Sequence, residues 1–232
     1  MTRPLFLSLL CLLFFVGLAL PAIYHRLLPG EELVYHAIRA RQSPLCDSLF
    51  RALTKAGSYP VLVPLGVGVV IWQRANGRLL VFLAFYSLGV PLLEAGAKYA
   101  VARPRPRYPL GGDPLSHVTH GFPSGHALAA AAFYGMLLVL LHRKEGGRWR
   151  WGITACLLLL VLLVGVSRVY RAAHWPSDVL GGYALGGAYC ALATAVYRQI
   201  EHRDQAKQAR TGPEHVGGND LILPPHRALD GL

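Results

Sequence analysis

The sequence contains few charged residues and none of the common metal-binding motifs. Only 15% of its 232 residues are charged, whereas 53% are hydrophobic, and the mean hydropathy is +0.38. A composition this apolar favours an integral membrane protein over a soluble enzyme. Neither Cys-x-x-Cys nor His-Glu-x-x-His occurs, so we expect no metal and no bound cofactor. The four cysteines lie far apart and form no disulfide framework.

Acidic residues are scarce, with 12 Asp and Glu against 23 Lys and Arg and a net charge of +11. An excess of this size can indicate binding to nucleic acid. Here, however, the basic residues fall in short clusters between apolar runs and do not line one soluble face. Nucleic acid is therefore excluded as a partner, and no feature of the sequence indicates an obligate protein partner.

Six apolar runs alternate with polar segments. They comprise residues 5–22, 56–73, 79–93, 127–141, 151–166 and 179–197. This pattern predicts an all-α integral membrane protein with a bundle of about six transmembrane helices. The first run is longer than the apolar part of a signal peptide, roughly 7 to 15 residues, so we expect an uncleaved anchor, with a cleaved leader as the alternative.

The segment between the first two runs and the C-terminal segment are both polar. Within residues 24–55, apolar side chains recur at helical spacing, which predicts short helices that lie in the membrane interface or pack against the rim of the bundle. Residues 201–232 are rich in Gly and Pro with few apolar residues, so we expect a disordered cytoplasmic tail. Residues 1–200 are expected to form one membrane domain.

With six spans, alternate polar segments share a side of the membrane. Residues 24–55, 98–122 and 167–177 lie together, and the basic turn 143–150 lies opposite. Once the candidate ligands described below are set aside, the side of the basic turn is the richer in Lys and Arg, which assigns it to the cytoplasm. The other side is expected to face outward.

Three segments on this outer side carry ionisable side chains at regular spacings. They are Lys98, six residues, Arg105-Pro106; then Pro123-Ser124-Gly125-His126; then Ser167-Arg168, five residues, His174, three residues and Asp178. Such side chains at a membrane boundary are costly unless they pair or take part in chemistry. Three cations with two histidines and a carboxylate are the side chains that phosphoryl transfer needs.

Individually, several of these residues have structural explanations. His126 at a helix start could be a cap, and Arg168 could reach lipid headgroups. Glu94 and Lys98 share a helix face and could form an ordinary stabilising pair. Arg103 precedes a proline but has the wrong spacing from Lys98, so we interpret it as a decoy.

In order and spacing, the three segments resemble the signature of the type 2 phosphatidic acid phosphatase superfamily, which includes membrane lipid phosphatases and vanadium haloperoxidases. The resemblance covers residues 58–198. It implies that His174 is the nucleophile and forms a phosphohistidine, that Asp178 holds its other ring nitrogen, and that His126 is the general acid and base. The phosphate-binding residues that it implies are Lys98, Arg105, Ser124, Gly125 and Arg168.

The resemblance implies a metal-independent phosphatase acting on a lipid phosphate or pyrophosphate in the bacterial inner membrane. Undecaprenyl pyrophosphate, phosphatidylglycerol phosphate and phosphatidic acid are the candidate substrates. The alternatives are a broad-specificity acid phosphatase on soluble monoesters and a lipid or anion transporter; a soluble haloperoxidase conflicts with the apolar composition. Four further residues could contact headgroups, although structural or surface roles are favoured: Arg107, His120, Tyr170 and Arg171.

Overall fold

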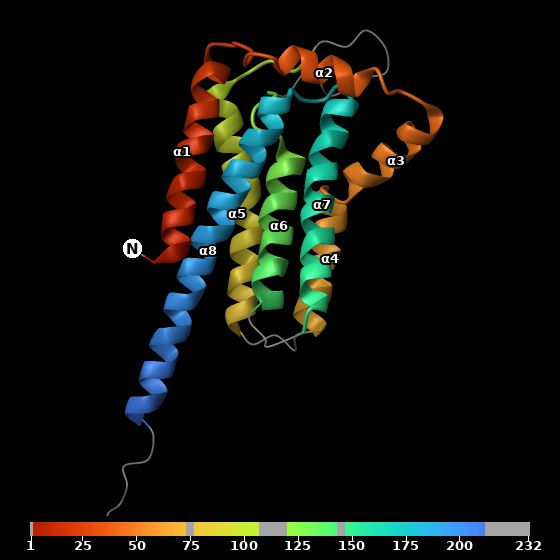
Figure 1. Cartoon of the computed structure of the whole chain (residues 1–232). Coiled ribbons are helices and arrows are strands. Elements are labelled where there is room, and N and C mark those ends of the chain that lie inside the picture. Colours follow the sequence, from red (N-terminus) through yellow and green to blue (C-terminus); the bar gives the residue numbers. More distant parts are fainter. Residues whose placement is uncertain (1, 73–76, 107–119, 143–146, 212–232) are drawn as a thin grey trace, which may run out of the picture. The chain divides into compact units, whose positions relative to one another are not determined.

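The computed structural model describes residues 2–72, 77–106, 120–142 and 147–211, and all regular structure in these ranges is helical. Within them the helices are α1 (Arg3–Ile23), α2 (Glu31–Arg39), α3 (Pro44–Lys55), α4 (Tyr59–Trp72), α5 (Gly77–Val101), α6 (Gly125–His142), α7 (Trp149–Tyr170) and α8 (Pro176–Thr211) (Figure 1). The predicted all-α fold class is therefore confirmed.

The six predicted apolar runs fall on six different helices, α1 and α4 to α8, and α2 and α3 occupy the polar segment between the first two runs. Among the described residues, α1, α6, α7 and Pro176–Arg203 of α8 are long and apolar enough to cross a membrane. α3 and α4 pass the same test as a bent pair. α5 is 25 residues long and contains the third run.

The second span differs from the expected straight helix. α4 begins at Tyr59, and its described part extends to Trp72. The chain bends by 49° between α3 and α4. At the bend, a Cβ on Gly57 would lie 2.5 Å from Val164 Cγ1 and 3.0 Å from the carbonyl oxygen of His126. Glycine is thus required where the bend meets the start of α6.

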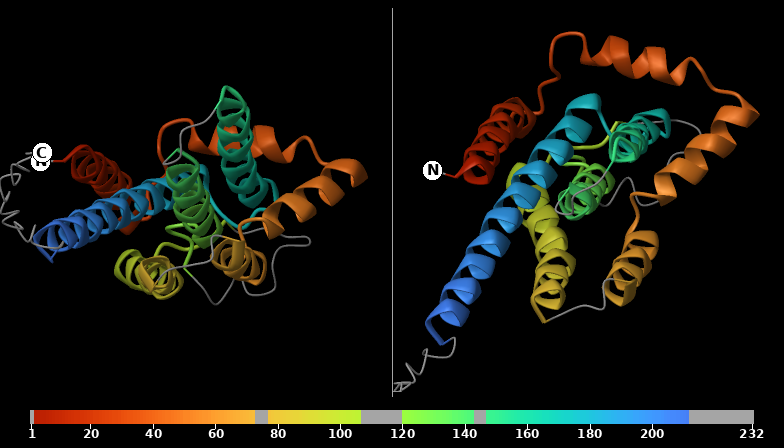
Figure 2. Two further views of the ribbon diagram at one scale, coloured as in Figure 1. Left: turned by 90° about the horizontal axis from the view of Figure 1, so that it is seen from below. Right: turned by 60° about the horizontal axis from the view of Figure 1, so that its bottom comes forward.

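Helix α6 forms the centre of the bundle. Its buried side chains include Leu128, Phe133 and Met136. They share a hydrophobic core with Leu62 of α4 and Val164 of α7, and with residues of α5 and α8. The two views in Figure 2 show these helices around α6.

Small residues let α8 approach α6 closely at the end where both helices begin. A Cβ on Gly182 would lie 2.5 Å from the carbonyl oxygen of Ser124, and one on Gly186 would lie 2.5 Å from that of Leu128. Glycines four residues apart allow this kind of backbone contact between membrane helices. The contact brings the first turns of α6 and α8 together, and both carry predicted site residues.

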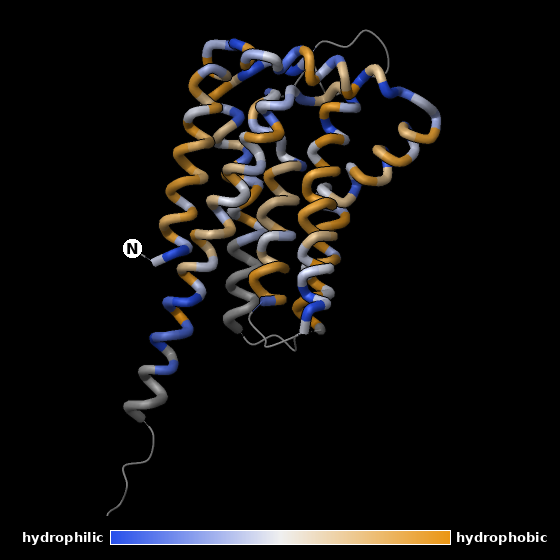
Figure 3. The backbone as a smooth tube through the Cα atoms, in the orientation of Figure 1, coloured by the Kyte–Doolittle hydropathy of each residue, from blue (hydrophilic) through white to orange (hydrophobic). Residues whose placement is uncertain are grey.

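The outer surface of the bundle is apolar. Along α1, for example, Phe6, Leu7, Leu13 and Phe14 are each more than half exposed, and Figure 3 shows the same hydrophobic colouring over the spans. An exposed apolar surface of this extent is typical of a protein surrounded by lipid.

The chain divides into two units, residues 1–197 and 198–232. A disordered tail was expected from residue 201, but the helix continues to Thr211. Residues 201–211 contain Glu, Gln, Ala, Lys and Arg, which are good helix formers. Residues 212–232 lie outside the described residues.

Candidate active site

The start of α6 is tied directly to the start of α8. The Ser124 N–H donates a hydrogen bond to the carbonyl oxygen of Asp178 at 2.9 Å. The Ser124 N–H is therefore not available to bind an anion. What Ser124 retains is its hydroxyl: the fully buried Oγ has no hydrogen-bond partner among the described residues. A buried, unpartnered hydroxyl is costly and marks a place where a ligand can bind.

Gly125 and His126 are the first two residues of α6. The N–H of a first helical residue has no acceptor within its helix, which favours an anion at that position. A Cβ on Gly125 would overlap the Glu94 carboxylate, so a larger residue here would have to displace that side chain. Glu94 in turn accepts from Lys98 Nζ at 2.5 Å and from the Tyr59 hydroxyl at 3.0 Å.

Three cations come from three different segments of the chain. Lys98 lies in the last turn of α5, Arg105 lies in the segment after α5, and Arg168 lies in the last turn of α7. Arg168 is 6% exposed, and its Nη1 donates to Thr54 Oγ1 at 2.9 Å. The charges of all three act on both His174 and His126. The structure therefore brings the predicted cations and histidines together.

His174 lies between α7 and α8, and 1% of it is exposed. Its Nδ1 lies 2.8 Å from the carbonyl oxygen of Gly121. A carbonyl oxygen only accepts, so Nδ1 carries the proton and Nε2 keeps a free lone pair. Burial and nearby positive charges lower the pKa of His174 well below its usual range. The imidazole is therefore neutral, as a nucleophile must be.

Asp178 does not contact His174 as closely as expected. Its Oδ2 lies 3.6 Å from His174 Nδ1, beyond hydrogen-bond distance, and accepts instead from the N–H of Trp175 at 2.9 Å. Its Oδ1 accepts from Arg103 Nη1 at 2.7 Å. The Gly121 carbonyl is thus the nearer partner of the imidazole, and Asp178 lies beside it.

Arg103 is the site residue that sequence reasoning missed. It is 2% exposed and bonded to Asp178, although its spacing made it look like a decoy. Its side-chain partners lie 72 to 77 residues away in the sequence, so no local pattern connects them. The one available signal was that Arg103 lies between Lys98 and Pro104, close to the first motif. This position alone does not predict that the side chain is buried.

The four residues considered as possible headgroup contacts lie in different environments. The Tyr170 hydroxyl is buried and donates to Asp47 Oδ1 at 2.5 Å, a structural bond to α3. Arg171 is half-buried, and His120 is exposed. Arg107 lies outside the described residues.

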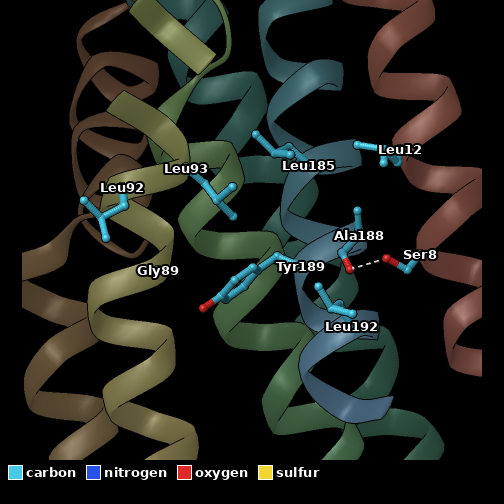
Figure 4. Close-up of a pocket in the computed structure, with 9 residues that line it drawn as sticks. All are labelled: Ser8, Leu12, Gly89, Leu92, Leu93, Leu185, Ala188, Tyr189 and Leu192. Carbon is cyan, nitrogen blue, oxygen red and sulfur yellow. Dashed lines mark hydrogen bonds between the residues drawn. The ribbon is translucent and has the colours of Figure 1, made fainter. Parts of the chain in front are cut away.

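Two cavities flank the site. One, of about 490 Å³, is lined by Arg105, Trp175 and His36 among others. The other, of about 420 Å³, lies between α1, α5 and α8, and Figure 4 shows its mostly apolar lining, which includes Leu93 and Leu185. In the described part of the chain, no group of three or more His, Cys, Asp or Glu residues could hold a metal ion.

Comparison with known proteins identifies a family, two relatives and a similar solved structure. A sequence model of the PAP2 superfamily matches residues 79–201. Phosphatidylglycerophosphatase B of Bacillus subtilis (strain 168) is 29% identical over 181 residues, which cover 75% of this chain and 86% of that protein. An undecaprenyl-diphosphatase of Sulfolobus acidocaldarius is 28% identical over 177 residues, covering 71% and 80%.

Among solved structures, the crystal structure of a transmembrane PAP2 type phosphatidylglycerolphosphate phosphatase from Bacillus subtilis is similar to this fold. It has a TM-score of 0.70 at 25% identity, and the match covers 84% of this chain and 98% of that one. The matched family segment, residues 79–201, contains every residue from Lys98 to Asp178 that the sequence analysis assigned to the site.

Proposed function

Because the chain belongs to the PAP2 superfamily and is a phosphatase of that family, we propose that it hydrolyses a lipid phosphate or lipid pyrophosphate at the membrane surface. The observation that carries this proposal is the buried His174, whose Nδ1 lies 2.8 Å from the Gly121 carbonyl oxygen and on which three positive charges act. Lys98, Arg105 and Arg168 can neutralise a phosphate dianion, and the arginines add paired charge-assisted hydrogen bonds.

The proposed reaction has two steps. His174 Nε2 attacks phosphorus, the bond from phosphorus to the lipid oxygen breaks, and the electron pair stays on that oxygen, which takes a proton from the imidazolium form of His126. The negative charge of the bound phosphate offsets the three cations and stabilises that form. Water then attacks the phosphohistidine, gives a proton to His126, and releases inorganic phosphate and neutral His174. The unpartnered Ser124 hydroxyl and the Gly125 N–H are suited to the phosphoryl oxygens.

No metal or other cofactor enters this scheme. Three fixed cations supply the charge stabilisation that metal ions supply in many phosphatases. We therefore expect phosphate release from lipid substrates to continue in the presence of EDTA. Loss of all activity on chelation, restored by Mg²⁺, would contradict the scheme.

The apolar cavity supports a lipid substrate. Leu93 lies five residues before Lys98 on α5, and Leu185 lies seven residues after Asp178 on α8, which places the cavity about 7 to 10 Å along the helices from the site. An acyl or prenyl chain attached to a phosphate in the site would reach it. Undecaprenyl pyrophosphate, phosphatidylglycerol phosphate and phosphatidic acid are the proposed candidates.

We place the protein in the bacterial inner membrane with the site facing the periplasm. The two relatives named above act, by their names, on lipid phosphates or diphosphates. Because the two names refer to two different lipids, we propose the substrate class, a lipid phosphate or pyrophosphate, and not a single lipid. A periplasmic site would recycle lipid carriers after their use outside the cytoplasm.

The test is a comparison of kcat/KM for the three candidate lipids and a soluble phosphate monoester, with purified protein in detergent and EDTA present. We expect the lipids to be preferred by at least about tenfold, because the apolar chain adds binding energy. Equal kcat/KM for the soluble monoester would support a broad-specificity phosphatase instead. Absence of phosphate release from every substrate would favour a transporter.

A further inference from the structure

We propose that Arg103 is a positioning residue for the reaction. The Arg103 side chain holds the Asp178 carboxylate, and the Arg103 backbone holds Gly121, whose carbonyl accepts a hydrogen bond from His174. The proposal rests on the proposed phosphatase function. It also assigns a role to the buried Glu31 of α2, which lies outside all three sequence motifs.

The side chain of Arg103 is held by acceptors from three parts of the chain. Its Nη1 donates to Asp178 Oδ1 at 2.7 Å and to Ser177 Oγ at 2.6 Å. Its Nη2 donates to the Arg26 carbonyl oxygen at 3.2 Å and to Glu31 Oε2 at 3.3 Å. A guanidinium this deeply buried is costly unless it is paired and hydrogen-bonded. Here it lies between two carboxylates that are themselves buried.

The backbone of Arg103 leads to the imidazole by a second route. The Gly121 N–H donates to the Arg103 carbonyl oxygen at 2.6 Å, and the Gly121 carbonyl accepts from His174 Nδ1. A Cβ on Gly121 would lie 3.2 Å from Asp178 Oδ2, so the backbone at Gly121 packs directly on the carboxylate. Pro104 and Pro106 restrict the backbone that follows. The positions of Asp178 and of the Gly121 carbonyl, which both lie beside the His174 ring, thus depend on Arg103.

Glu31 extends the arrangement to α2. Its Oε1 accepts from the Ser177 N–H at 2.8 Å and from the Ser177 hydroxyl, and its Oε2 accepts from the Leu28 N–H at 2.8 Å. Ser177 is the second residue of α8, where an N–H has no acceptor within the helix. A carboxylate is also favoured there by the helix dipole. Glu31 therefore caps the helix that carries Asp178.

These contacts predict an effect on turnover and not on substrate affinity. Both terminal nitrogens of Arg103 contact protein acceptors, so the side chain is not directed at a phosphate. Lysine has one nitrogen and cannot reproduce the fork. In Arg103→Lys, Asp178 would lose a partner and could turn toward Nδ1, which would shift the ring and misalign Nε2. Such misalignment lowers kcat and leaves KM unchanged.

The experiment measures kcat, KM for phosphatidic acid and the inhibition constant of vanadate for the full chain in detergent. For Arg103→Lys we expect kcat to fall by about tenfold or more, with KM and the vanadate constant within about twofold of wild type. The matched control is Arg105→Lys, in which KM and the vanadate constant should rise. Arg103 also lines the 490 Å³ cavity, so added methylguanidinium should restore part of the kcat of Arg103→Ala.

A residue that only stabilises the fold would give a different result. Its loss would lower the melting temperature while kcat per folded molecule stayed constant, and methylguanidinium would not restore activity. If Arg103→Lys does not fold, Ser177→Ala removes one contact to Arg103 and one to Glu31, and its kcat should fall by about threefold at constant KM. Wild-type kcat in the folded variants would overturn the proposal. An inactive wild type would instead refute the proposed function.

Discussion

Three features of its surroundings would prepare His174 for the proposed attack on phosphorus. The Gly121 carbonyl fixes the proton on Nδ1, burial removes solvent, and positive charges oppose a second proton. The last two effects act in the same direction, because each disfavours the imidazolium. The proposed nucleophile is thus kept neutral by the same cations that we propose attract its substrate.

The pKa shift predicts how His174 responds to pH. Because its folded pKa lies well below the usual 6.5, the titration midpoint of the ring in ¹⁵N NMR spectra should lie clearly below that value, with the signal assigned by His174→Asn. In the unfolded chain the ring takes up a proton near pH 6.5, so acidification below that value should destabilise the fold. In Arg168→Gln the pKa should rise. A wild-type midpoint near 6.5 would contradict this account.

Glu94 partly neutralises a cation of the site, which predicts a gain of affinity on its removal. Its carboxylate lies 2.5 Å from Lys98 Nζ, and both side chains are less than one-fifth exposed. Glu94→Gln should therefore tighten vanadate binding by about threefold to tenfold, since Lys98 then acts at full charge. Tyr59→Phe removes the hydrogen bond to Glu94 but keeps both charges, and its vanadate affinity should stay at the wild-type value. Weaker binding to Glu94→Gln would count against a cationic cradle.

At the scale of the helices, the apolar runs predicted where the long helices lie, because a membrane allows few other structures, and four of these helices in the described ranges, or five with the bent α3–α4 pair, are long and apolar enough to span. The three motifs likewise predicted that three cations lie near His174 and His126, but not which groups contact Asp178 and the His174 ring. What the sequence did not reveal depends on contacts between distant segments. Gly57 bends the chain only because α6 and α7 lie against it, and Arg103 is buried only because Glu31 and Asp178 face it. Neither contact can be predicted from the residues next to Gly57 or Arg103 in the sequence.

The contact between α6 and α8 should be sensitive to a single methyl group. A Cβ on Gly186 would meet the Leu128 carbonyl oxygen at 2.5 Å, whereas one on Gly187 would meet only Cys11 Sγ at 3.5 Å. Gly186→Ala should lower the free energy of unfolding by about 1–3 kcal/mol and reduce activity, because backbone must move. Gly187→Ala is the control and should match wild type in melting temperature and activity. Equal behaviour of the two variants would refute the close-packing argument.

At the scale of the whole molecule, the site lies at the end of the membrane bundle where α6 and α8 begin, beside α2 (Figure 1). The chain enters α7 at the opposite end, after the basic turn. The excess of Lys and Arg at that end is what predicts a cytoplasmic location for it and an outward-facing site.

Sidedness can be measured with single cysteines in a background that lacks the four native ones. Gln42→Cys, in the exposed connection between α2 and α3, should react with an impermeant maleimide in intact cells. Arg148→Cys, exposed just before α7, should react only after permeabilisation. The reverse pattern would invert the topology and exclude a periplasmic reaction.

The central claim is that His174 forms a covalent bond to phosphorus. Wild-type protein quenched during turnover of ³²P-labelled lipid phosphate should carry an acid-labile, base-stable label, as a phosphohistidine does. His174→Ala should carry none and should not turn over, while still binding vanadate through its three cations. In His126→Ala, a substrate with a low-pKa leaving group should let the label accumulate, because the second step lacks its base. Full turnover by His174→Ala, or label on that variant, would contradict the mechanism.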